Sequence, residues 1–307
     1  MQLNGFHHLT AITADAPRNH NFYTQVLGLR MVKKTVNQDD TSAYHLFYAD
    51  GLGSAGTDIT FFDWPAAHEK RGTNSAVRTG LRIQGEHAIS YWVDRFKTLD
   101  IKAEKPALEN GRQIIAFEDF EGQRLALVVD EAENAANIWA KSPVPAEHQI
   151  RGLGPITLSI ADHQHTDLIL TDVMGMKRGS PFGKTLVYKM NGHGAVAELH
   201  VQVEPDLPRA HQGAGAVHHV AFNIAMADYD AWADRLVQMR IPHSGKVDRF
   251  WFKSLYFREP SGILFEIATD GPGFQADEPM DKLGETLSLP PFLESKRAAI
   301  EAGLKKL

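Results

Sequence analysis

Two histidine pairs are the residues of this sequence whose types and positions first suggest metal chemistry. Each pair lies near the start of a segment that alternates like a β-strand, residues 6–10 (FHHLT) and 217–221 (VHHVA). Because successive side chains of a strand point to opposite faces, one histidine of each pair is expected to face inward. The apolar residues that follow mark the helix-covered face, which leaves His8 and His219 pointing into the interior.

Glu266 is the one carboxylate in an otherwise apolar run, residues 263–268 (ILFEIA). A buried, unpaired carboxylate is costly or takes up a proton, so a compensating partner is expected. Two neutral imidazoles and a carboxylate satisfy a divalent cation and leave coordination positions open, as in non-heme Fe(II) oxygenases. The sequence therefore predicts a metal site made of His8, His219 and Glu266.

An aromatic segment, residues 248–258 (DRFWFKSLYFR), precedes Glu266. Aromatic walls suit an aromatic substrate. Near a metal, the Tyr256 phenol could exchange a proton with a bound hydroxyl, and the Arg249 guanidinium could hold an anionic oxygen. Both residues are therefore candidates for the same site.

Internal repeats predict the elements that position these residues. A shift of 147 residues lays Asp15 on Asp162 and the apolar-Gly-apolar motif around Gly28 on that around Gly175. The aspartates are predicted to cap helices at their N-termini, and the glycines to end them in a left-handed conformation.

A second shift, of 140 residues, aligns two hairpins that turn at Gly122 and Gly262. Together the shifts divide the chain into four units that each read βαβββ. A unit of this kind cannot bury its sheet alone, so units must pair around a shared cavity. We expect an α+β fold of four tandem βαβββ modules, paired into curled mixed sheets or half-barrels, from residues 6–64, 87–130, 154–203 and 216–269.

The repeats also serve as an internal control on the metal site. His8 falls on Pro155 and Glu266 on Ala126, so neither the second nor the third unit keeps the corresponding ligand. One site per chain is expected. Asp63 is predicted to occupy in the first unit the position of Glu266 in the fourth, and it is either a fourth ligand or a cap of the turn before Pro65.

The Pro/Gly-rich stretch at 142–153 predicts a linker. It divides the chain into an N-terminal pair of modules, residues 1–141, and a C-terminal pair, residues 154–270. A tail at 271–307 follows, with a terminal helix predicted over 294–306.

Composition limits the location and partners of the protein. The 307 residues are 43% hydrophobic and 23% charged, carry a formal net charge of −6 and include no cysteine. No thiolate metal site or disulfide can form, and no broad basic face awaits nucleic acid or anionic lipid. Neither a signal-peptide pattern nor an apolar run of membrane-spanning length is visible. We expect a cytoplasmic protein with no nucleic acid or membrane partner. The sequence leaves open whether the protein forms a homo-oligomer.

With these residues in place, the chain resembles the vicinal-oxygen-chelate superfamily, and within it the hydroquinone-type ring-cleaving extradiol dioxygenases. The resemblance spans nearly the whole chain. It rests on segments at 7–10 (HHLT), 22–29 (FYTQVLGL), 60–65 (TFFDWP), 142–148 (SPVPAEH), 151–154 (RGLG), 218–222 (HHVAF), 248–249 (DR), 254–258 (SLYFR), 264–268 (LFEIA) and 289–293 (LPPFL).

The resemblance implies that the ligands predicted above bind Fe(II), and Mn(II) would suit the same site. It also implies that Tyr256 is the catalytic acid/base and that Arg249 lies beside the metal ligands. It adds three further neighbours of the site, namely Thr10, His7 and His218. For His7 and His218, strand alternation predicts that the side chain points to the face opposite His8 and His219. The resemblance and the alternation therefore disagree on these two residues.

The function so implied is an Fe(II)-dependent extradiol-type dioxygenase that cleaves the ring of a hydroquinone-like or catechol-like substrate with O2. Two alternatives stay open. A glyoxalase-, epimerase- or thiol-transferase-like lyase or isomerase of the same superfamily would use the metal as a Lewis acid, and such sites usually add a second carboxylate, here Asp63. A metal-free protein that sequesters an aromatic compound is the other.

Overall fold

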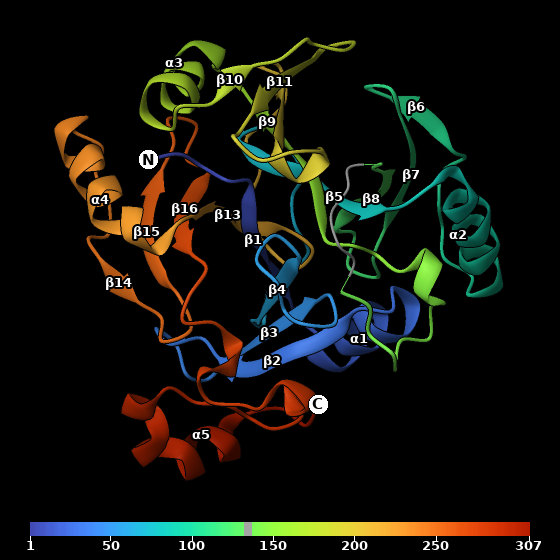
Figure 1. Ribbon diagram of the computed structural model, residues 1–307, viewed down its shortest axis with the longest axis vertical. Helices are drawn as coiled ribbons and strands as arrows, with labels where there is room; N and C mark the ends of the chain where they lie inside the picture. Colours follow the sequence, from blue (N-terminus) through green and yellow to red (C-terminus); the bar gives the residue numbers. More distant parts are fainter. Residues whose placement is uncertain (132–136) are drawn as a thin grey trace.

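The computed structural model describes residues 1–131 and 137–307, so residues 132–136 of the predicted range 1–141 lie outside the described residues. The described residues form two eight-stranded mixed sheets, each curled into a half-barrel, with α-helices at the periphery (Figure 1). The expected α+β fold of paired βαβββ modules is confirmed. The helices are α1 (Ala16–Asn21), α2 (Glu86–Thr98), α3 (His163–Leu168), α4 (Tyr229–Gln238) and α5 (Arg297–Gly303).

The first sheet has the strand order β14-β15-β16-β13-β1-β4-β3-β2. It is built from the first and fourth units, which meet where β1 pairs antiparallel with β13. Its strands are β1 (Phe6–Thr13), β2 (Arg30–Val36), β3 (Tyr44–Ala49), β4 (Asp58–Asp63), β13 (Val217–Ile224), β14 (Val247–Asp248), β15 (Lys253–Arg258) and β16 (Leu264–Thr269).

The second sheet has the order β10-β11-β12-β9-β5-β8-β7-β6 and joins the second and third units where β5 pairs with β9. Each sheet thus combines strands from before and after the predicted linker at 142–153. The division of the chain into an N-terminal and a C-terminal pair of modules stays a prediction. The strands are β5 (Ser75–Ile83), β6 (Ala107–Glu109), β7 (Arg112–Glu118), β8 (Arg124–Val129), β9 (Leu153–Ile160), β10 (Lys177–Arg178), β11 (Thr185–Lys189) and β12 (Glu198–Val203).

The second unit begins earlier than predicted. Residue 87 lies in the first turn of α2, and the opening strand of the unit is β5, which starts at Ser75. The range 87–130 therefore omitted a strand. That strand, SAVRTGLRI, carries two arginines and one glycine, so it lacks the clean alternation of the other opening strands.

The helix caps predicted from the first repeat are confirmed. Asp15 accepts a hydrogen bond from the backbone N–H of Arg18, and Asp162 accepts one from Gln164. Gly28 and Gly175 adopt left-handed φ angles of 74° and 70°. A side chain at either position would be strained, which is why glycine ends both helical segments.

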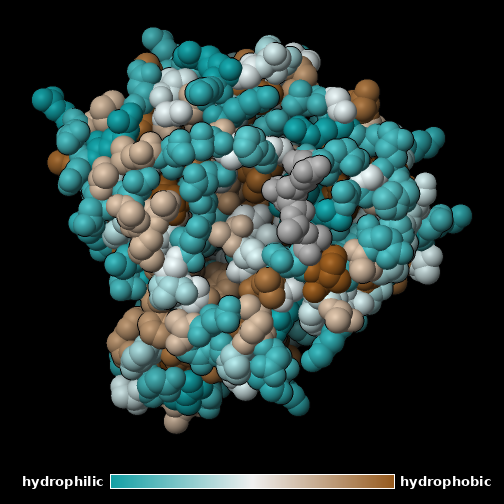
Figure 2. All heavy atoms as spheres, viewed as in Figure 1, coloured by the Kyte–Doolittle hydropathy of each residue, from teal (hydrophilic) through white to brown (hydrophobic). Residues whose placement is uncertain are grey.

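The hydrophobic core lies between the sheets and their helices. Leu9 and Val220, on the covered face of β1 and β13, are fully buried, as are Trp232 and Leu236 of α4. The opposite, concave face of the first sheet holds the polar residues discussed below. On the face of the molecule shown in Figure 2, hydrophobic side chains are scattered among hydrophilic ones.

The C-terminal tail packs along the edge strand β2. Ser288 donates its backbone N–H to the carbonyl of Lys34, and α5 follows a short 3₁₀ segment at residues 291–296 (Figure 1). The terminal helix is therefore shorter than the predicted range 294–306. Among the described residues, none of the helices is both long and apolar enough to cross a membrane.

Candidate metal centre

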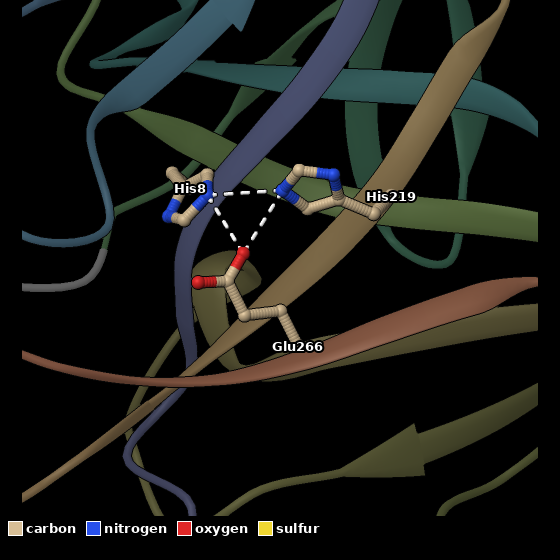
Figure 3. A group of neighbouring side chains, drawn as sticks. All are labelled: His8, His219 and Glu266. Atoms are coloured by element: carbon tan, nitrogen blue, oxygen red, sulfur yellow. Dashed lines mark hydrogen bonds and ion pairs between the residues drawn. The ribbon is translucent and has the colours of Figure 1, made fainter. Parts of the chain in front are cut away.

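The three predicted ligands come together on the concave face of the first sheet (Figure 3). His8 Nε2 lies 3.2 Å from His219 Nε2 and 3.2 Å from Glu266 Oε2, and His219 Nε2 lies 2.9 Å from the same oxygen. All three side chains are at most 4% exposed. Within residues 1–131 and 137–307, this is the one group of three or more potential ligand side chains that meets so closely.

Strand pairing accounts for this convergence. The central strands β1 and β13 run antiparallel, so His8 and His219 approach each other across the shared interface of the two units. Strand β16 runs parallel to β13 with Glu266 opposite Ala221, two residues past His219. Because residues two apart in a strand share a face, the carboxylate lies on the same face as both imidazoles.

The chemistry of the donor set suits a divalent cation. Oε1 of Glu266 accepts a hydrogen bond from Ser254 Oγ at 2.5 Å, whereas Oε2 is fully buried and makes no well-aligned hydrogen bond to any described residue, although both Nε2 atoms are close. A buried acceptor of this kind is costly without a partner. A metal ion bound by the two Nε2 atoms and Oε2 would supply that partner.

Electrostatics agree with this assignment. Burial alone would raise the pKa of Glu266, but His8 and His219 beside it hold that pKa well below 4.5. Burial lowers the pKa of His219, although Glu266 opposes the shift. The carboxylate is therefore anionic while the His219 imidazole keeps a free lone pair, the protonation state that metal ligands require.

His7 fixes the orientation of the His8 ring. His7 Nε2 lies 3.1 Å from the carbonyl oxygen of Thr269, which can only accept, so Nε2 carries the proton. Burial lowers the pKa of His7 to about 3, so the ring is neutral and its Nδ1 is an acceptor. His8 Nδ1, 2.8 Å away, must then donate, which leaves the lone pair of His8 on Nε2.

His218 stands in the same relation to His219, with their Nδ1 atoms 2.8 Å apart. Burial lowers the pKa of His218 to about 3 as well. Strand alternation predicted that His218 faces away from the cavity. This prediction is wrong, because His218 lines the cavity together with His219. The two rings meet edge to face, with an interplanar angle of 78°.

The ligand atoms open into a cavity of about 590 Å³. Its lining combines aromatic side chains with polar ones, among them both ligand histidines. This composition is typical of a pocket for a small aromatic molecule. The aromatic wall consists of Phe47, Phe62, Trp64, Trp251 and Phe252.

Tyr256 and Arg249 line this cavity, as predicted. Arg249 Nε lies 3.3 Å from Tyr256 Oη, and its guanidinium forms a two-bond ion pair with Asp39 at 2.8 and 3.1 Å. Burial raises the pKa of Tyr256, and the charge of Glu266 adds to this effect. Arg249 lies in a loop between β14 and β15, where Phe250 has a left-handed φ of 73°, and not in a continuous strand.

Thr10 lies on β1 opposite Thr60 of β4, and their hydroxyl oxygens are 2.8 Å apart. The same register corrects the prediction for Asp63. Thr10 of β1 pairs with Thr60 of β4, and Ala221, two residues past His219 on β13, pairs with Glu266 of β16. Because Thr10 likewise lies two residues past His8, the first-unit counterpart of Glu266 is Thr60. Asp63 lies three residues further along β4, where its Oδ1 accepts a hydrogen bond from Lys305 Nζ at 2.8 Å.

The second half-barrel has lost the corresponding site. Pro155 and Ala126, which replace His8 and Glu266, line a cavity of only about 20 Å³. Arg112, which also lines this small cavity, forms an ion pair with Glu198. The internal control drawn from the repeats thus agrees with the structure.

Among the cavity residues that sequence reasoning missed, His45 is the histidine. His45 of β3 lies between Phe47 and Phe62 and its Nε2 is 2.9 Å from Thr60 Oγ1. In the sequence, His45 is a lone histidine in an alternating run, residues 44–49 (YHLFYA). Because no other unit has a matching histidine, the sequence alone does not distinguish it from a histidine on the surface of a strand.

Comparisons with known proteins agree with this fold. The model of the Glyoxalase/Bleomycin resistance protein/Dioxygenase superfamily matches residues 5–127 and 152–267. MhqA of Bacillus subtilis (strain 168), provisionally named a ring-cleaving dioxygenase, is 45% identical over 315 aligned positions that cover 100% of both chains.

Two further relatives extend the comparison. The chlorohydroquinone/hydroquinone 1,2-dioxygenase of Sphingobium indicum is 28% identical and covers 95% of this chain and 93% of its own. A crystal structure of a Bacillus subtilis protein, provisionally described as a dioxygenase, superposes with a TM-score of 0.94 at 34% identity, covering 100% of this chain and 98% of that one. The chain therefore belongs to the glyoxalase/bleomycin resistance protein/dioxygenase superfamily.

Proposed function

We propose that this protein is an Fe(II)-dependent extradiol-type dioxygenase that cleaves the aromatic ring of a hydroquinone-like or catechol-like substrate with O2. The observation that carries the proposal is the convergence of His8, His219 and Glu266 beside a cavity with aromatic walls. The relatives named as ring-cleaving dioxygenases, one of them for hydroquinones, support the same reaction class.

Fe(II), when bound by these three residues, would supply the redox chemistry that joins O2 to the ring. Mn(II) would suit the same hard nitrogen and oxygen donors. Three protein ligands would leave coordination positions of such an ion free for substrate and O2. The remaining steps belong to the protein side chains.

Tyr256 and Arg249 would handle the protons and charges of the substrate oxygens. Because its pKa is raised, the Tyr256 phenol is protonated at neutral pH and can donate a hydrogen bond to an anionic ring oxygen, then exchange that proton. The Arg249 guanidinium would stabilise the same negative charge. The aromatic walls orient the ring and exclude water.

A metal-dependent lyase or isomerase is the second candidate, and it requires a second carboxylate on the metal. The register offers Thr60 at that position, and the carboxylate of Asp63 is held by Lys305. Asp63→Ala is therefore expected to leave the metal content unchanged and to reduce stability modestly. Metal analysis of the purified variant measures this, and loss of metal would favour the lyase.

A metal-free aromatic-binding protein is the third candidate. It would leave the buried Oε2 of Glu266 without a well-aligned partner, at a cost of about 1–3 kcal/mol. Elemental analysis of freshly purified protein distinguishes this candidate. We expect about one equivalent of a divalent transition metal per chain in wild type, and a large loss in Glu266→Gln.

Oxygen uptake is the direct test of the proposed function. Apoprotein is reconstituted with Fe(II) under argon and then mixed with oxygenated buffer that contains methylhydroquinone or catechol. We expect one O2 consumed per substrate, with ring-opened product detected by mass spectrometry. Glu266→Gln, which keeps the shape of the side chain, should abolish uptake. Absence of uptake across hydroquinones and catechols would refute the oxygenase assignment.

A further inference from the structure

A loop of the first unit holds a cavity residue of the fourth unit. Residues 37–43 connect β2 to β3, and Gln38 Nε2 in this loop donates to the backbone carbonyl of Arg249 at 2.8 Å. The next residue, Asp39, accepts two hydrogen bonds from the Arg249 guanidinium, one from Nη1 at 3.1 Å and one from Nη2 at 2.8 Å. The same loop therefore contacts both the main chain and the side chain of Arg249.

Hydrogen bonds within the loop fix the position of Asp39. The side-chain oxygen of Asn37, a buried residue, accepts a hydrogen bond from the backbone N–H of Asp39 at 2.9 Å. The backbone N–H of Asn37 in turn donates to the carbonyl of Ala43 at 2.9 Å, which closes the loop. The Asp39 backbone is therefore anchored, although its side chain is 72% exposed.

The Arg249 side chain needs a partner to keep one orientation. It extends from the loop between β14 and β15, and an arginine side chain gives up considerable rotamer freedom when it is ordered. Among the residues that the structure describes, Asp39 is the one carboxylate within 4.0 Å of a nitrogen of this guanidinium. The orientation of Arg249 therefore depends on Asp39.

This ion pair determines which nitrogen of Arg249 faces Tyr256. With both Nη atoms bound to Asp39, Nε lies 3.3 Å from Tyr256 Oη, and the guanidinium carbon lies 5.3 Å from the centroid of the phenol ring. A guanidinium only donates hydrogen bonds, so Tyr256 Oη is the acceptor. The phenol proton must then point away from Arg249, and Tyr256 lines the cavity in which a ligand could accept it.

The ion pair is expected to contribute more to this orientation than to folding. Hydrogen bonds from Arg249 lower the pKa of Asp39, so the carboxylate is charged at neutral pH. The Arg249 side chain is 19% exposed, but its partner is largely in solvent. Ion pairs that are exposed in this way add little to the free energy of unfolding.

We infer that Asp39 is a positioning residue, which holds Arg249 Nε against the Tyr256 oxygen and thereby orients the phenol proton toward the cavity. This inference rests on the proposed function, in which Tyr256 transfers a proton. It adds a residue of the first unit to a pair that the fourth unit contributes. A residue that acts through Tyr256 should lose its effect on turnover once the phenol hydroxyl is removed.

The order of the Arg249 side chain can be measured without turnover. The full-length protein, labelled with nitrogen isotope at arginine, is loaded with Zn(II), which is diamagnetic and suits imidazole and carboxylate ligands. The Nε–H resonance of Arg249 is assigned by its absence in Arg249→Lys. We expect its heteronuclear NOE to be that of an ordered group in wild type and in Asp39→Glu, and that of a mobile side chain in Asp39→Ala.

Turnover of the Fe(II)-loaded protein gives the second readout. We expect Asp39→Ala to lower kcat about tenfold and to change KM much less, because misorienting a general acid or base loses only part of its contribution of about 10²–10⁴-fold. Asp39→Glu, which keeps the carboxylate, should recover most of kcat. Asp230→Asn is the matched control, because Asp230 is an exposed aspartate with an ion pair of 2.8 Å to Lys246 and does not line the cavity.

A double-mutant cycle separates positioning from an independent effect. In the Tyr256→Phe background, Asp39→Ala should change kcat by less than about twofold, since no phenol proton remains to be oriented. Thermal unfolding midpoints of Asp39→Ala and Asp230→Asn should be alike, which excludes general damage.

Three results would overturn the inference: an ordered Arg249 Nε–H in Asp39→Ala, a wild-type kcat in that variant, or a loss of kcat that persists in the Tyr256→Phe background. If wild type consumes no O2 with hydroquinones or catechols, the proposed function fails. The NMR comparison then still decides whether Asp39 holds Arg249.

Discussion

The proposed function assigns proton transfer to the Tyr256 phenol. Its hydroxyl lies 3.3 Å from Arg249 Nε, and burial together with Glu266 raises its pKa, so it is neutral when substrate enters. Tyr256→Phe removes only the hydroxyl and keeps the aromatic wall. We expect kcat to fall by about 10²–10⁴-fold, the usual contribution of a general acid or base.

Metal content and O2 uptake of Tyr256→Phe check this expectation together. The bound metal should equal that of wild type, because Tyr256 is not among the three ligand side chains. Tyr44→Phe is the control, since its hydroxyl donates to the backbone of Lys305 and does not line the cavity. A variant with wild-type kcat would exclude Tyr256 from proton transfer.

Single residues were predictable where type and position reinforced each other. His8, His219 and Glu266 stood in apolar strands at matched positions, so their convergence followed from strand alternation. Asp63 was misplaced because an ungapped comparison of the units cannot locate the turns, whereas the hydrogen-bonded register identifies Thr60. His45 was missed because it has no histidine counterpart in the fourth unit.

At the scale of elements, the turn between β7 and β8 contains a carboxyl whose ionisation is coupled to folding. Asp119 accepts hydrogen bonds from the backbone N–H groups of Glu121 and Gln123, each at 2.9 Å, and from the Tyr23 hydroxyl at 3.1 Å. Burial outweighs these bonds and raises the pKa of Asp119 from 3.8 to about 6.

The raised pKa makes this turn more stable in acid. The folded state binds the Asp119 proton more tightly than the unfolded state, so its contribution is fully present below pH 3.8 and is lost as the pH rises through about 6. The difference corresponds to roughly 3 kcal/mol. Asp119→Asn should remove this slope of the free energy of unfolding between pH 4 and 7.

Urea unfolding at several pH values, compared between wild type and Asp119→Asn, measures the slope. Asp206→Asn, at an exposed loop position, should follow the wild-type profile. If Asp119→Asn keeps the wild-type slope, the titration of this turn does not contribute to stability.

Helix ends and turns could be predicted from the sequence where two units carry the same residue at the same position. The caps Asp15 and Asp162 and the turn glycines Gly122 and Gly262 agree with the structure, with φ angles of 86° and 94° at the two turns. The segment at 247–257 reads as one strand but divides at the left-handed Phe250. A non-glycine residue in that conformation leaves no sequence signature, because tertiary contacts stabilise it.

At the scale of the whole molecule, a buried ion cluster ties the tail to the first sheet. Lys33 of β2 is fully buried, and its ammonium contacts Asp277 at 2.8 Å and also pairs with Glu278. Trp251, beside Arg249 in the cavity loop, donates its indole N–H to Asp277. The tail therefore supports a wall of the pocket through this cluster.

Lys33→Met should destabilise the protein by roughly 3 kcal/mol, because it leaves buried carboxylates without their cation. Denaturant unfolding measures the change. Lys34→Met is the neighbouring control, since Lys34 makes an exposed hydrogen bond to Glu285, and it should cost less than about 1 kcal/mol. A loss below about 1 kcal/mol in Lys33→Met would show that the cluster does not hold the tail.

The pairing of the first unit with the last has a consequence for synthesis of the chain. During translation His8 leaves the ribosome long before His219 and Glu266, and the growing polypeptide holds at most one of the three donors until its fourth unit emerges. Strand β1 must wait for β13 as its partner, since their antiparallel pairing joins the two halves of the first sheet at its centre. An ion can therefore be held by all three donors only after the fourth unit has been synthesised, so an incomplete chain lacks the full site.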